Sequence, residues 1–332
     1  MLRVAMLSGW HVHAKGYARE LNAIENVKVT AVWDEEPERG QQWAAELGVD
    51  FEKDLDTLLK RQDIDAVAVN TPTSMHKEVI IAAANAGKHI FTEKVLAFTV
   101  KDCHEIAEAV QKTGVKFCIS FPHRTLSHNL FAKKVAEEGL IGDITLLRVR
   151  NAHDGASSDW LPDHFYDPET CGGGAMMDLG AHVMYLSRWI LGEPVRITSM
   201  FNSYTGRAVE DNAVSMIEFK NKAIAIAETG FVSTRSPYSL ELYGTEGSLF
   251  VGGPENQIKL TSNKIKGPVD GWITPTQLPK ALPSALEQWV KGILEGGEIH
   301  FGLEEATQLT ELMEAAYISY REGRMVDFKE IR

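Results

Sequence analysis

Short runs of apolar and β-branched residues alternate with helical patterns through the first third of this 332-residue chain. Such runs are typical of strands buried on both faces, and the helices between them are typical of the crossovers that parallel strands need. The pattern predicts an α/β domain with a parallel sheet, whose ligands bind at the carboxyl edge of the strands. The predicted strands are Arg3–Leu7, Val27–Trp33, Ile64–Val69, His89–Phe91 and Lys116–Ser120.

The pattern changes after Pro122, which we take as the boundary between two domains. Several extended segments then follow one another without helices between them, which implies antiparallel pairing. We predict a parallel α/β domain over residues 1–122 and an α+β domain over residues 123–332, in line with about two domains for this length. The extended segments are Val195–Tyr204, Ala213–Phe219, Ala223–Phe231, Ser239–Tyr243 and Ser248–Val251.

Composition argues against several classes of protein. With 34 basic and 46 acidic residues the net charge is −12, whereas a nucleic-acid binder needs a clustered basic surface. No apolar run approaches the roughly 18 residues of a membrane helix, so we expect neither a membrane partner nor a signal peptide. The cysteines Cys103, Cys118 and Cys171 form no CxxC motif, which favours a reducing compartment. We therefore expect a cytoplasmic protein with a small-molecule ligand.

The turn after the first predicted strand has some features of a dinucleotide-binding fingerprint. Such a fingerprint joins a strand to a helix through three glycines, which let the backbone approach a pyrophosphate. Here only Gly9 is glycine, because Ser8 and Trp10 stand where the other glycines are expected. The backbone N–H groups from Gly9 to Val12, with His11 between them, are then the candidates for pyrophosphate contact.

Two charged residues end predicted strands at the same edge. Asp34 ends the second strand, where a carboxylate accepts hydrogen bonds from an adenosine ribose and repels a 2′-phosphate, so it favours NAD over NADP. Lys94 stands at the end of the predicted strand that begins at His89, and it could act on a ligand at this edge. The alternatives are an exposed strand-end carboxylate for Asp34 and a surface lysine in an ordinary ion pair with Glu93 for Lys94.

A carboxylate and an imidazole stand four residues apart on the helix that follows Gly172-Gly173-Gly174. At helical spacing Asp178 and His182 lie on one side, so the carboxylate can orient the imidazole as a general base requires. The alternative is an Asp favoured by the helix N-terminus and an interface histidine with a structural role. On this side they are accompanied by Tyr185 and Trp189, whereas the apolar stripe consists of Met176, Leu179, Val183, Leu186 and Ile190.

A metal site competes with the acid–base interpretation. Asp178 and His182 supply half of a ligand set, and the preceding loop carries His153, Asp154, Asp159, Asp163 and His164. The chain has no HExxH motif and no cysteine ligand pair, so we expect no catalytic metal.

Several motifs together resemble the Gfo/Idh/MocA oxidoreductase family, named for glucose–fructose oxidoreductase and inositol 2-dehydrogenase. The resemblance covers essentially the whole chain, and the glycine-rich segment is its most specific part. The motifs are Asp34, Thr71-Pro72 with His76, Ala86-Gly87-Lys88-His89, Glu93-Lys94, Gly139-Leu140-Ile141-Gly142 and Gly172-Gly173-Gly174-Ala175-Met176-Met177-Asp178-Leu179-Gly180-Ala181-His182.

The resemblance implies an NAD-binding Rossmann domain followed by a domain with a large open, mostly antiparallel sheet. That sheet usually forms homodimers or homotetramers in the family, and the active site lies between the domains. The implied catalytic residues are Lys94, Asp178 and His182. The implied cofactor contacts are Ser8, Gly9, Trp10, His11, Val12, Asp34, Thr71, Pro72, His76, Glu93 and Lys94. The substrate contacts that we expect are His123, Arg124, His153, Trp160, Asp178 and His182.

The resulting hypothesis is NAD-dependent oxidation of a secondary alcohol on a sugar, inositol or related polyol. His182 takes the hydroxyl proton, Lys94 hydrogen-bonds the developing alkoxide, and Asp178 orients His182. The chain departs from the family at the degraded glycine turn, at Val95, where proline is usual, and at Tyr185, where many members carry aspartate. Two alternatives stay open: a redox-neutral NAD-dependent epimerase or glycoside-cleaving enzyme, and a non-catalytic nucleotide or sugar sensor.

Overall fold

The computed structural model describes residues 1–265 and 271–332. They form two compact units, Met1–Phe121 with Pro283–Thr310, and Pro122–Leu282 with Glu311–Arg332. The chain thus first passes from one unit to the other at Pro122, where the sequence pattern changes. Residues 283–310 pack with the first unit, although the predicted division places them in the second segment.

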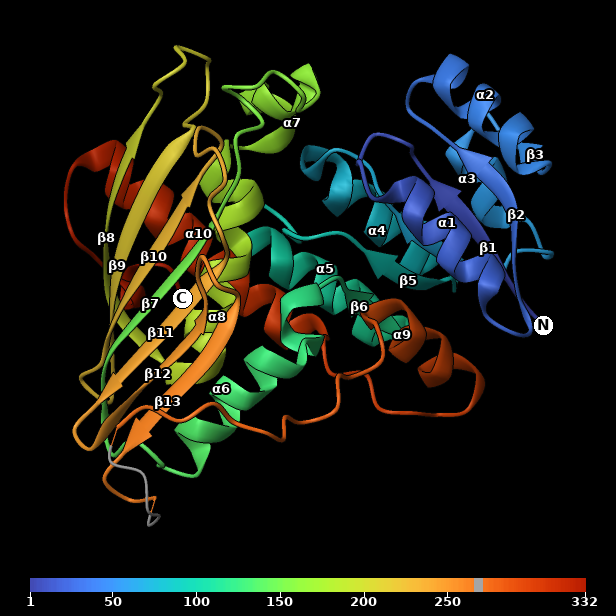
Figure 1. Ribbon diagram of the computed structural model, residues 1–332. Coiled ribbons are helices and arrows are strands. Elements are labelled where there is room, and N and C mark those ends of the chain that lie inside the picture. The colour runs from blue at the N-terminus through green and yellow to red at the C-terminus, as the bar shows by residue number, and fades with distance from the viewer. Residues whose placement is uncertain (266–270) are drawn as a thin grey trace. The chain divides into compact units, whose positions relative to one another are not determined.

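The first unit contains a six-stranded sheet in the order β3-β2-β1-β4-β5-β6, and every neighbouring pair is parallel (Figure 1). This is the order of a dinucleotide-binding Rossmann sheet, so the prediction of a parallel α/β fold is confirmed. The strands are β1 (Leu2–Leu7), β2 (Val27–Trp33), β3 (Asp50–Phe51), β4 (Ala66–Val69), β5 (His89–Thr92) and β6 (Phe117–Ile119). The helices are α1 (Ala14–Ala23), α2 (Pro37–Leu47), α3 (Leu55–Lys60), α4 (His76–Asn85) and α5 (Val100–Thr113).

Local sequence signals explain where these helices begin and end. Helix α2 has Pro37 in its first turn and ends at Gly48, whose φ is 66°. Helix α5 is capped by Thr99, whose hydroxyl accepts a hydrogen bond from the Asp102 N–H at 3.1 Å. The strands between them are buried on both faces: all of β4 is inaccessible to solvent.

Helix α9 (Ala285–Leu294) belongs to the first unit, although it lies far along the chain. A capping box between Ser284 and Glu287 starts the helix. Its Trp289 is wholly buried, with its ring centroid 5.8 Å from that of Phe91 on β5. Burial of this indole explains why the segment returns to the parallel sheet.

The second unit contains an eight-stranded sheet in the order β13-β12-β11-β7-β10-β9-β8-β14. All neighbouring pairs are antiparallel except β10 and β7, so the expected mostly antiparallel sheet is confirmed. The strands are β7 (Ile144–Ala152), β8 (Pro194–Asn202), β9 (Asn212–Phe219), β10 (Ile224–Gly230), β11 (Ser239–Gly244), β12 (Gly247–Gly252), β13 (Gln257–Ser262) and β14 (Val326–Asp327). The sequence patterns did not predict β13 and β14, which are the two edge strands.

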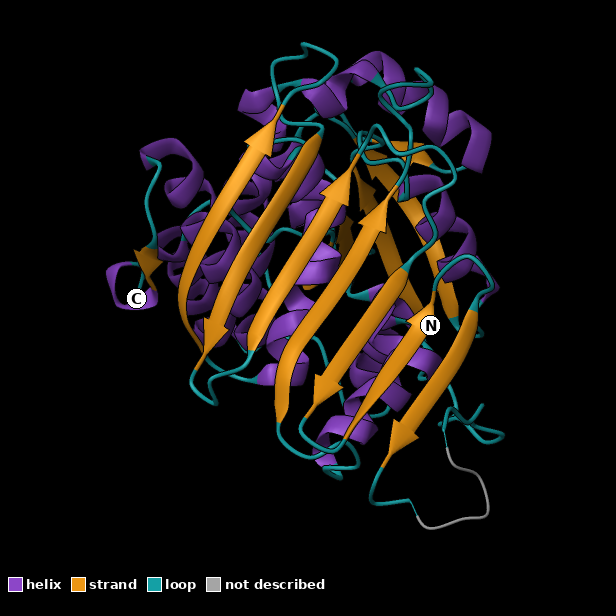
Figure 2. Cartoon of the chain, turned by 60° about the vertical axis from the view of Figure 1, so that its left-hand side comes forward, coloured by secondary structure: helices purple, strands orange, loops and turns teal. Residues whose placement is uncertain are grey.

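The helices of the second unit lie on one face of this sheet and leave its other face uncovered (Figure 2). They are α6 (Ser127–Glu137), α7 (Pro168–Cys171), α8 (Ala181–Leu191) and the second half of α10 (Leu303–Glu322). None of the described helices is both long enough and apolar enough to cross a membrane.

Candidate active site

The carboxyl edge of the parallel sheet brings together the residues predicted to contact the cofactor. Ser8 to Val12 follow β1, Asp34 follows β2, Thr71 and Pro72 come after β4, and Glu93 and Lys94 come after β5. Because all these strands are parallel, their carboxyl ends lie at one edge of the sheet. Hydrogen bonds join the loops, since the Gly9 N–H donates to Asp34 at 2.8 Å and the His11 N–H donates to the Asn70 carbonyl at 3.2 Å.

The turn between β1 and α1 keeps a glycine-like backbone at a position that is not glycine. Ser8 has a φ of 73°, in the left-handed region that glycine adopts most easily. Its hydroxyl accepts the Trp10 N–H at 3.0 Å, and its own N–H donates to the Trp33 carbonyl at 2.7 Å. These hydrogen bonds explain how serine holds this conformation.

Asp34 is 1% exposed, so the alternative of an exposed strand-end carboxylate is wrong. Its oxygens accept hydrogen bonds from the Gly9 and Glu36 N–H groups, both at 2.8 Å, and from the Arg39 guanidinium at 2.7 Å. Arg39 also pairs with Glu35 at 2.6 Å and Glu36 at 3.2 Å. Three carboxylates therefore surround one guanidinium, and this strand end carries excess negative charge.

Two polar atoms directly after β4 support a ligand site at this edge. Asn70 Oδ1 and Thr71 Oγ1 are buried and have no hydrogen-bond partner among the described residues. Buried polar groups in proteins are nearly always paired, so such atoms indicate a missing partner. The Asn70 oxygen accepts hydrogen bonds, and the Thr71 hydroxyl both donates and accepts them. The ribose hydroxyls and the amide of a dinucleotide can pair with both atoms, so the residues present fit NAD.

His76 links two of these loops. It is 1% exposed, with Nε2 at 3.2 Å from the Thr71 carbonyl oxygen and Nδ1 at 2.9 Å from the Val95 carbonyl oxygen. Burial lowers the pKa of His76 below its ordinary value. A neutral imidazole carries one N–H, so it donates to one of these carbonyl oxygens and packs against the other loop, whereas direct cofactor contact by His76 stays a prediction.

Lys94 is 5% exposed, so it is not the surface lysine of the alternative interpretation. Its backbone N–H donates to Glu93 Oε2 at 3.1 Å. Burial by itself would raise the pKa of Glu93. The charges of His11, His13 and Lys94 outweigh burial and hold this pKa well below its ordinary value. Lysine is seldom this buried unless it is paired or works in a site.

In the second unit, the triple glycine lets the Tyr317 side chain and the backbone of Glu210 approach closely. A Cβ on Gly173 would overlap the Tyr317 hydroxyl, and a Cβ on Gly174 would overlap the Glu210 carbonyl oxygen. Glu210 Oε1 accepts the Gly174 and Met176 N–H groups, each at 2.9 Å, and the Tyr317 hydroxyl at 2.6 Å. Burial raises the pKa of Glu210. Sequence reasoning missed Glu210 and Tyr317, since each lies far along the chain from the glycines.

The sequence predicted one continuous α-helix after the glycines, but the structure divides this segment into two parts. It begins with a π-helical turn, η4 (Met176–Gly180), and α8 starts only at Ala181. The α-helical spacing that placed Asp178 beside His182 therefore does not apply across this turn. Such turns are frequent at functional sites, and this one carries Asp178. The predicted apolar stripe is largely buried, at Met176, Val183, Leu186 and Ile190.

Tyr185 holds the imidazole of His182. The two side chains meet at 2.9 Å between Tyr185 Oη and His182 Nδ1, and both are buried. The same phenol oxygen accepts the backbone N–H of His123 at 3.1 Å. A phenol oxygen can accept two hydrogen bonds, so it can also accept the proton on Nδ1. In the tautomer that carries the proton on Nδ1, the unprotonated nitrogen is Nε2, which is the form that a general base needs.

The predicted substrate residues fall into two groups within the second unit. His123 lies with His182, at 4.6 Å between ring centroids. His153 stacks on Phe231 at 4.9 Å and lies 4.6 Å from the ring of Trp160. Burial lowers the pKa of His153, and the negative charges of Asp178 and Asp154 oppose this effect. The guanidinium of Arg124 lies over the Trp189 ring, 5.1 Å from its centroid.

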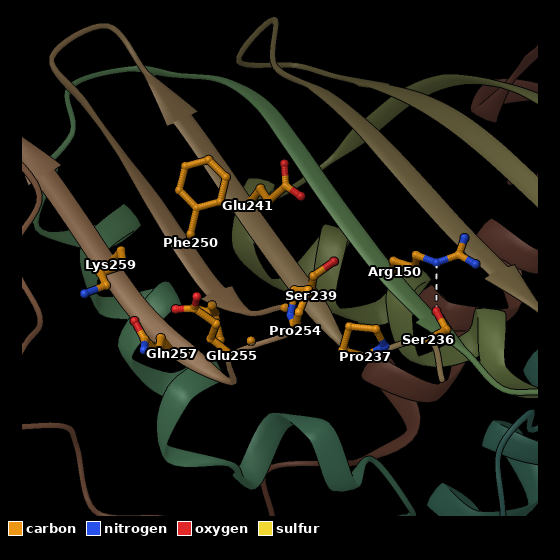
Figure 3. A pocket seen from close by; sticks show the side chains of 13 residues that line it. Arg150, Ser236, Pro237, Ser239, Glu241, Phe250, Pro254, Glu255, Gln257 and Lys259 are labelled. Carbon is orange, nitrogen blue, oxygen red and sulfur yellow. Dashed lines mark hydrogen bonds between the residues drawn. The ribbon is translucent and has the colours of Figure 1, made fainter. Parts of the chain in front are cut away.

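A pocket of about 450 Å³ lies on the second unit, at β11, β12, β13 and the end of β7 (Figure 3). Arg150, Glu241, Phe250 and Lys259 are among its lining residues, and Arg150 donates to Ser236 at 3.0 Å. None of the predicted site residues lines it. This pocket is therefore separate from the groups that could do acid–base chemistry.

Comparisons with known proteins agree with this description. Residues 3–121 match the family model of an oxidoreductase family with an NAD-binding Rossmann fold, and residues 130–250 match the GFO/IDH/MocA C-terminal domain. The scyllo-inositol 2-dehydrogenase (NAD(+)) of Bacillus subtilis is 31% identical over 74% of this chain and 72% of its own length. The myo-inositol 2-dehydrogenase of Thermotoga maritima is 26% identical over 95% of both chains. A solved structure of levoglucosan dehydrogenase in complex with NADH and L-sorbose superposes with a TM-score of 0.86, at 23% identity over 100% of both chains.

Proposed function

Because this chain belongs to the Gfo/Idh/MocA oxidoreductase family and carries its NAD-binding Rossmann domain, we propose that it oxidises a ring hydroxyl of a sugar, an inositol or a related polyol. It is an NAD-dependent oxidoreductase that acts on CH–OH groups. Bound NAD supplies the hydride acceptor, and the proton chemistry falls to the side chains. The names of the relatives, two inositol dehydrogenases and a levoglucosan dehydrogenase, support this substrate class.

The observation that carries the proposal is the contact between His182 and Tyr185. With Nδ1 held by the phenol oxygen, the imidazole presents Nε2 to take the hydroxyl proton. We assign Lys94 to hydrogen-bond the alkoxide as charge develops on it. We assign Asp178 to orient the substrate hydroxyls, because it stands on the π-helical turn that leads directly into the helix of His182.

A substrate panel tests the proposed function. The enzyme with NAD is offered inositols, anhydrosugars and aldoses at mildly alkaline pH, and NADH formation is followed by its absorbance. We expect net NADH formation with at least one cyclic polyol or sugar and none with simple aliphatic secondary alcohols. Product formation without NADH, or bound NAD with no turnover across the panel, would contradict a net dehydrogenase.

Cofactor choice follows from the charge at the end of β2. Asp34, Glu35 and Glu36 share the single guanidinium of Arg39, so a 2′-phosphate meets excess negative charge. We expect NAD to bind more tightly than NADP in a tryptophan-fluorescence titration. Tighter binding of NADP would show that Arg39 leaves its carboxylates for the phosphate.

Replacing Tyr185 by phenylalanine separates positioning from substrate binding. Without the phenol oxygen, Nδ1 of His182 loses its partner and the imidazole loses its fixed tautomer. We expect kcat to fall by about tenfold, one part of the roughly 10²–10⁴-fold that a positioned acid–base group contributes. KM and the dissociation constant of NAD should stay unchanged, because the ring still fills its place in α8. An unchanged kcat with a raised KM would place Tyr185 in substrate binding instead.

We infer further that the uncovered face of the eight-stranded sheet joins two copies of this chain. Apolar side chains stand exposed on its adjacent strands: Met200 is 72% exposed, Met216 48% and Ile224 45%, and Val214 pairs with Met200. A contiguous apolar surface of this kind favours association.

Size-exclusion chromatography with light scattering tests the interface. We expect Met216→Glu to convert an oligomer to a monomer, because a charge on the apolar face loses its water on association. Leu294→Glu, at an equally exposed apolar position on α9, is the matched control and should leave the oligomer intact. A wild-type monomer would contradict the inference.

A further inference from the structure

Two imidazoles and a carboxylate meet beside the turn that follows β1. The ligand atoms of His11, His13 and Glu93 all lie within 4.8 Å of one another. Nδ1 of His13 is 2.8 Å from Glu93 Oε1, and Nδ1 of His11 is 3.6 Å from the same oxygen. Among the residues described, these three form the group whose ligand atoms lie close enough together to hold one metal ion. The histidines and aspartates of the loop from His153 to His164, which the sequence offered as metal ligands, do not belong to this group.

We propose that His11, His13 and Glu93 bind one divalent first-row metal ion, and that Zn²⁺ is the ion best suited to them. Two imidazoles with one carboxylate form a ligand set known from zinc sites, with a fourth position left for water. Imidazole nitrogen also disfavours Mg²⁺ and Ca²⁺, which prefer oxygen ligands only. The ion would clamp the β1–α1 turn to the end of β5, in a chain whose turn lacks the usual glycines.

The distances suit one ion shared between these atoms. Ligands about 2.1 Å from a tetrahedral zinc ion lie about 3.4 Å apart, close to the separation of His11 Nδ1 from Glu93 Oε1. The distance between His13 Nδ1 and Glu93 Oε1 has to increase by about 0.6 Å from its present 2.8 Å. The His13 side chain is half-exposed, so it has room to make this movement. Nδ1 of His11 also accepts the His13 N–H at 3.2 Å, and ligation replaces this long hydrogen bond.

Neighbouring groups orient the carboxylate as they do in metal sites. The Tyr17 hydroxyl donates to Glu93 Oε1 and lies 2.8 Å from the Ser120 hydroxyl. The Lys94 N–H donates to the other oxygen, Oε2, at 3.1 Å. Such outer partners fix the direction in which a carboxylate presents its remaining lone pair. The His13 side chain is 50% exposed, which gives an ion access to a group that is otherwise buried.

An ion pair between Glu93 and His13 is the competing explanation, and metal titration separates the two. Untagged full-length protein is dialysed against EDTA, freed of chelator and titrated with Zn²⁺ by calorimetry in the absence of NAD. Cobalt(II) then serves as a probe, because tetrahedral ligation produces visible absorption bands. We expect about one equivalent of ion per chain, as a single three-ligand site predicts.

Three variants make the test specific. His13→Ala should abolish the stoichiometric site, and its partial exposure keeps the risk to folding small. Tyr17→Phe should weaken binding by about 10–100-fold, as loss of an outer partner does. His104→Ala, an exposed histidine on α5, is the matched control and should bind like the wild type.

Two results would overturn the proposal: no saturable binding to the wild-type protein, or His13→Ala binding as tightly as the wild type. Binding that persists in this variant is adventitious. Because the titration uses neither NAD nor substrate, its outcome is independent of the substrate panel.

Discussion

His182→Ala should lower kcat by about 10²–10⁴-fold, the contribution of a positioned general base. The structure supplies the reason, since Tyr185 contacts Nδ1 of this imidazole and is itself held by the backbone N–H of His123, which leaves Nε2 for the substrate proton. The dissociation constant of NAD, measured by fluorescence titration, should stay unchanged because His182 belongs to the second unit.

His128→Ala is the matched control for this variant. Its ring lies 5.6 Å from that of Tyr238, whose own ring is 5.3 Å from that of His123, so it borders the same aromatic group. We expect this variant to keep nearly wild-type turnover on the substrate found in the panel. If His182→Ala also keeps nearly wild-type turnover, the proton passes through another group and the assignment of the base is wrong.

Gly174→Ala should destabilise the second unit and weaken catalysis together. The added Cβ meets the Glu210 carbonyl oxygen and the Val209 side chain, and a backbone atom cannot move aside cheaply. Overpacking of this kind costs about 1–3 kcal/mol, and a contact with backbone falls at the upper end. The melting temperature should fall by roughly 2–4 °C for each kcal/mol in a unit of this size.

Gly16→Ala is the control for Gly174→Ala, and we expect it not to destabilise the protein. Gly16 lies in α1, and nothing is within 4 Å of an added Cβ. Alanine is the better helix former by about 1 kcal/mol, so this variant should be as stable as the wild type or more so. If the melting temperature changes by the same amount in both variants, the requirement for glycine at position 174 does not come from close packing.

Local periodicity was sufficient to predict much of the fold. The apolar runs predicted five of the six parallel strands of the first unit, because a strand buried on both faces needs an unbroken apolar sequence. They did not predict the two-residue edge strand β3. The closely spaced extended segments gave the antiparallel sheet. The edge strands β13 and β14 were missed, because β14 has only two residues and β13 is largely polar, with Ile258 and Leu260 as its two large apolar residues. The return of residues 283–310 to the first unit depends on where Trp289 is buried, and periodicity carries no such information.

The sequence by itself determined which chemical groups stand at the ends of strands and after the triple glycine. Asp34 and Lys94 were predictable there because parallel strands end at one edge, whatever else the chain does. The π-helical turn at Asp178 was not predictable, because an α-helical spacing fits the same residues equally well.

Only the tertiary structure decided what these groups contact. Glu210 reaches the N–H of Gly174 across 36 positions, and Glu93 reaches His13 across 80. The sequence showed Tyr185 beside His182 but gave no sign that its oxygen also accepts the His123 N–H, 62 positions away. Hydrogen bonds between distant segments depend on how the sheets and helices pack, whereas sequence patterns report only the neighbours along one element. The acid–base group and the proposed metal site both consist of such contacts.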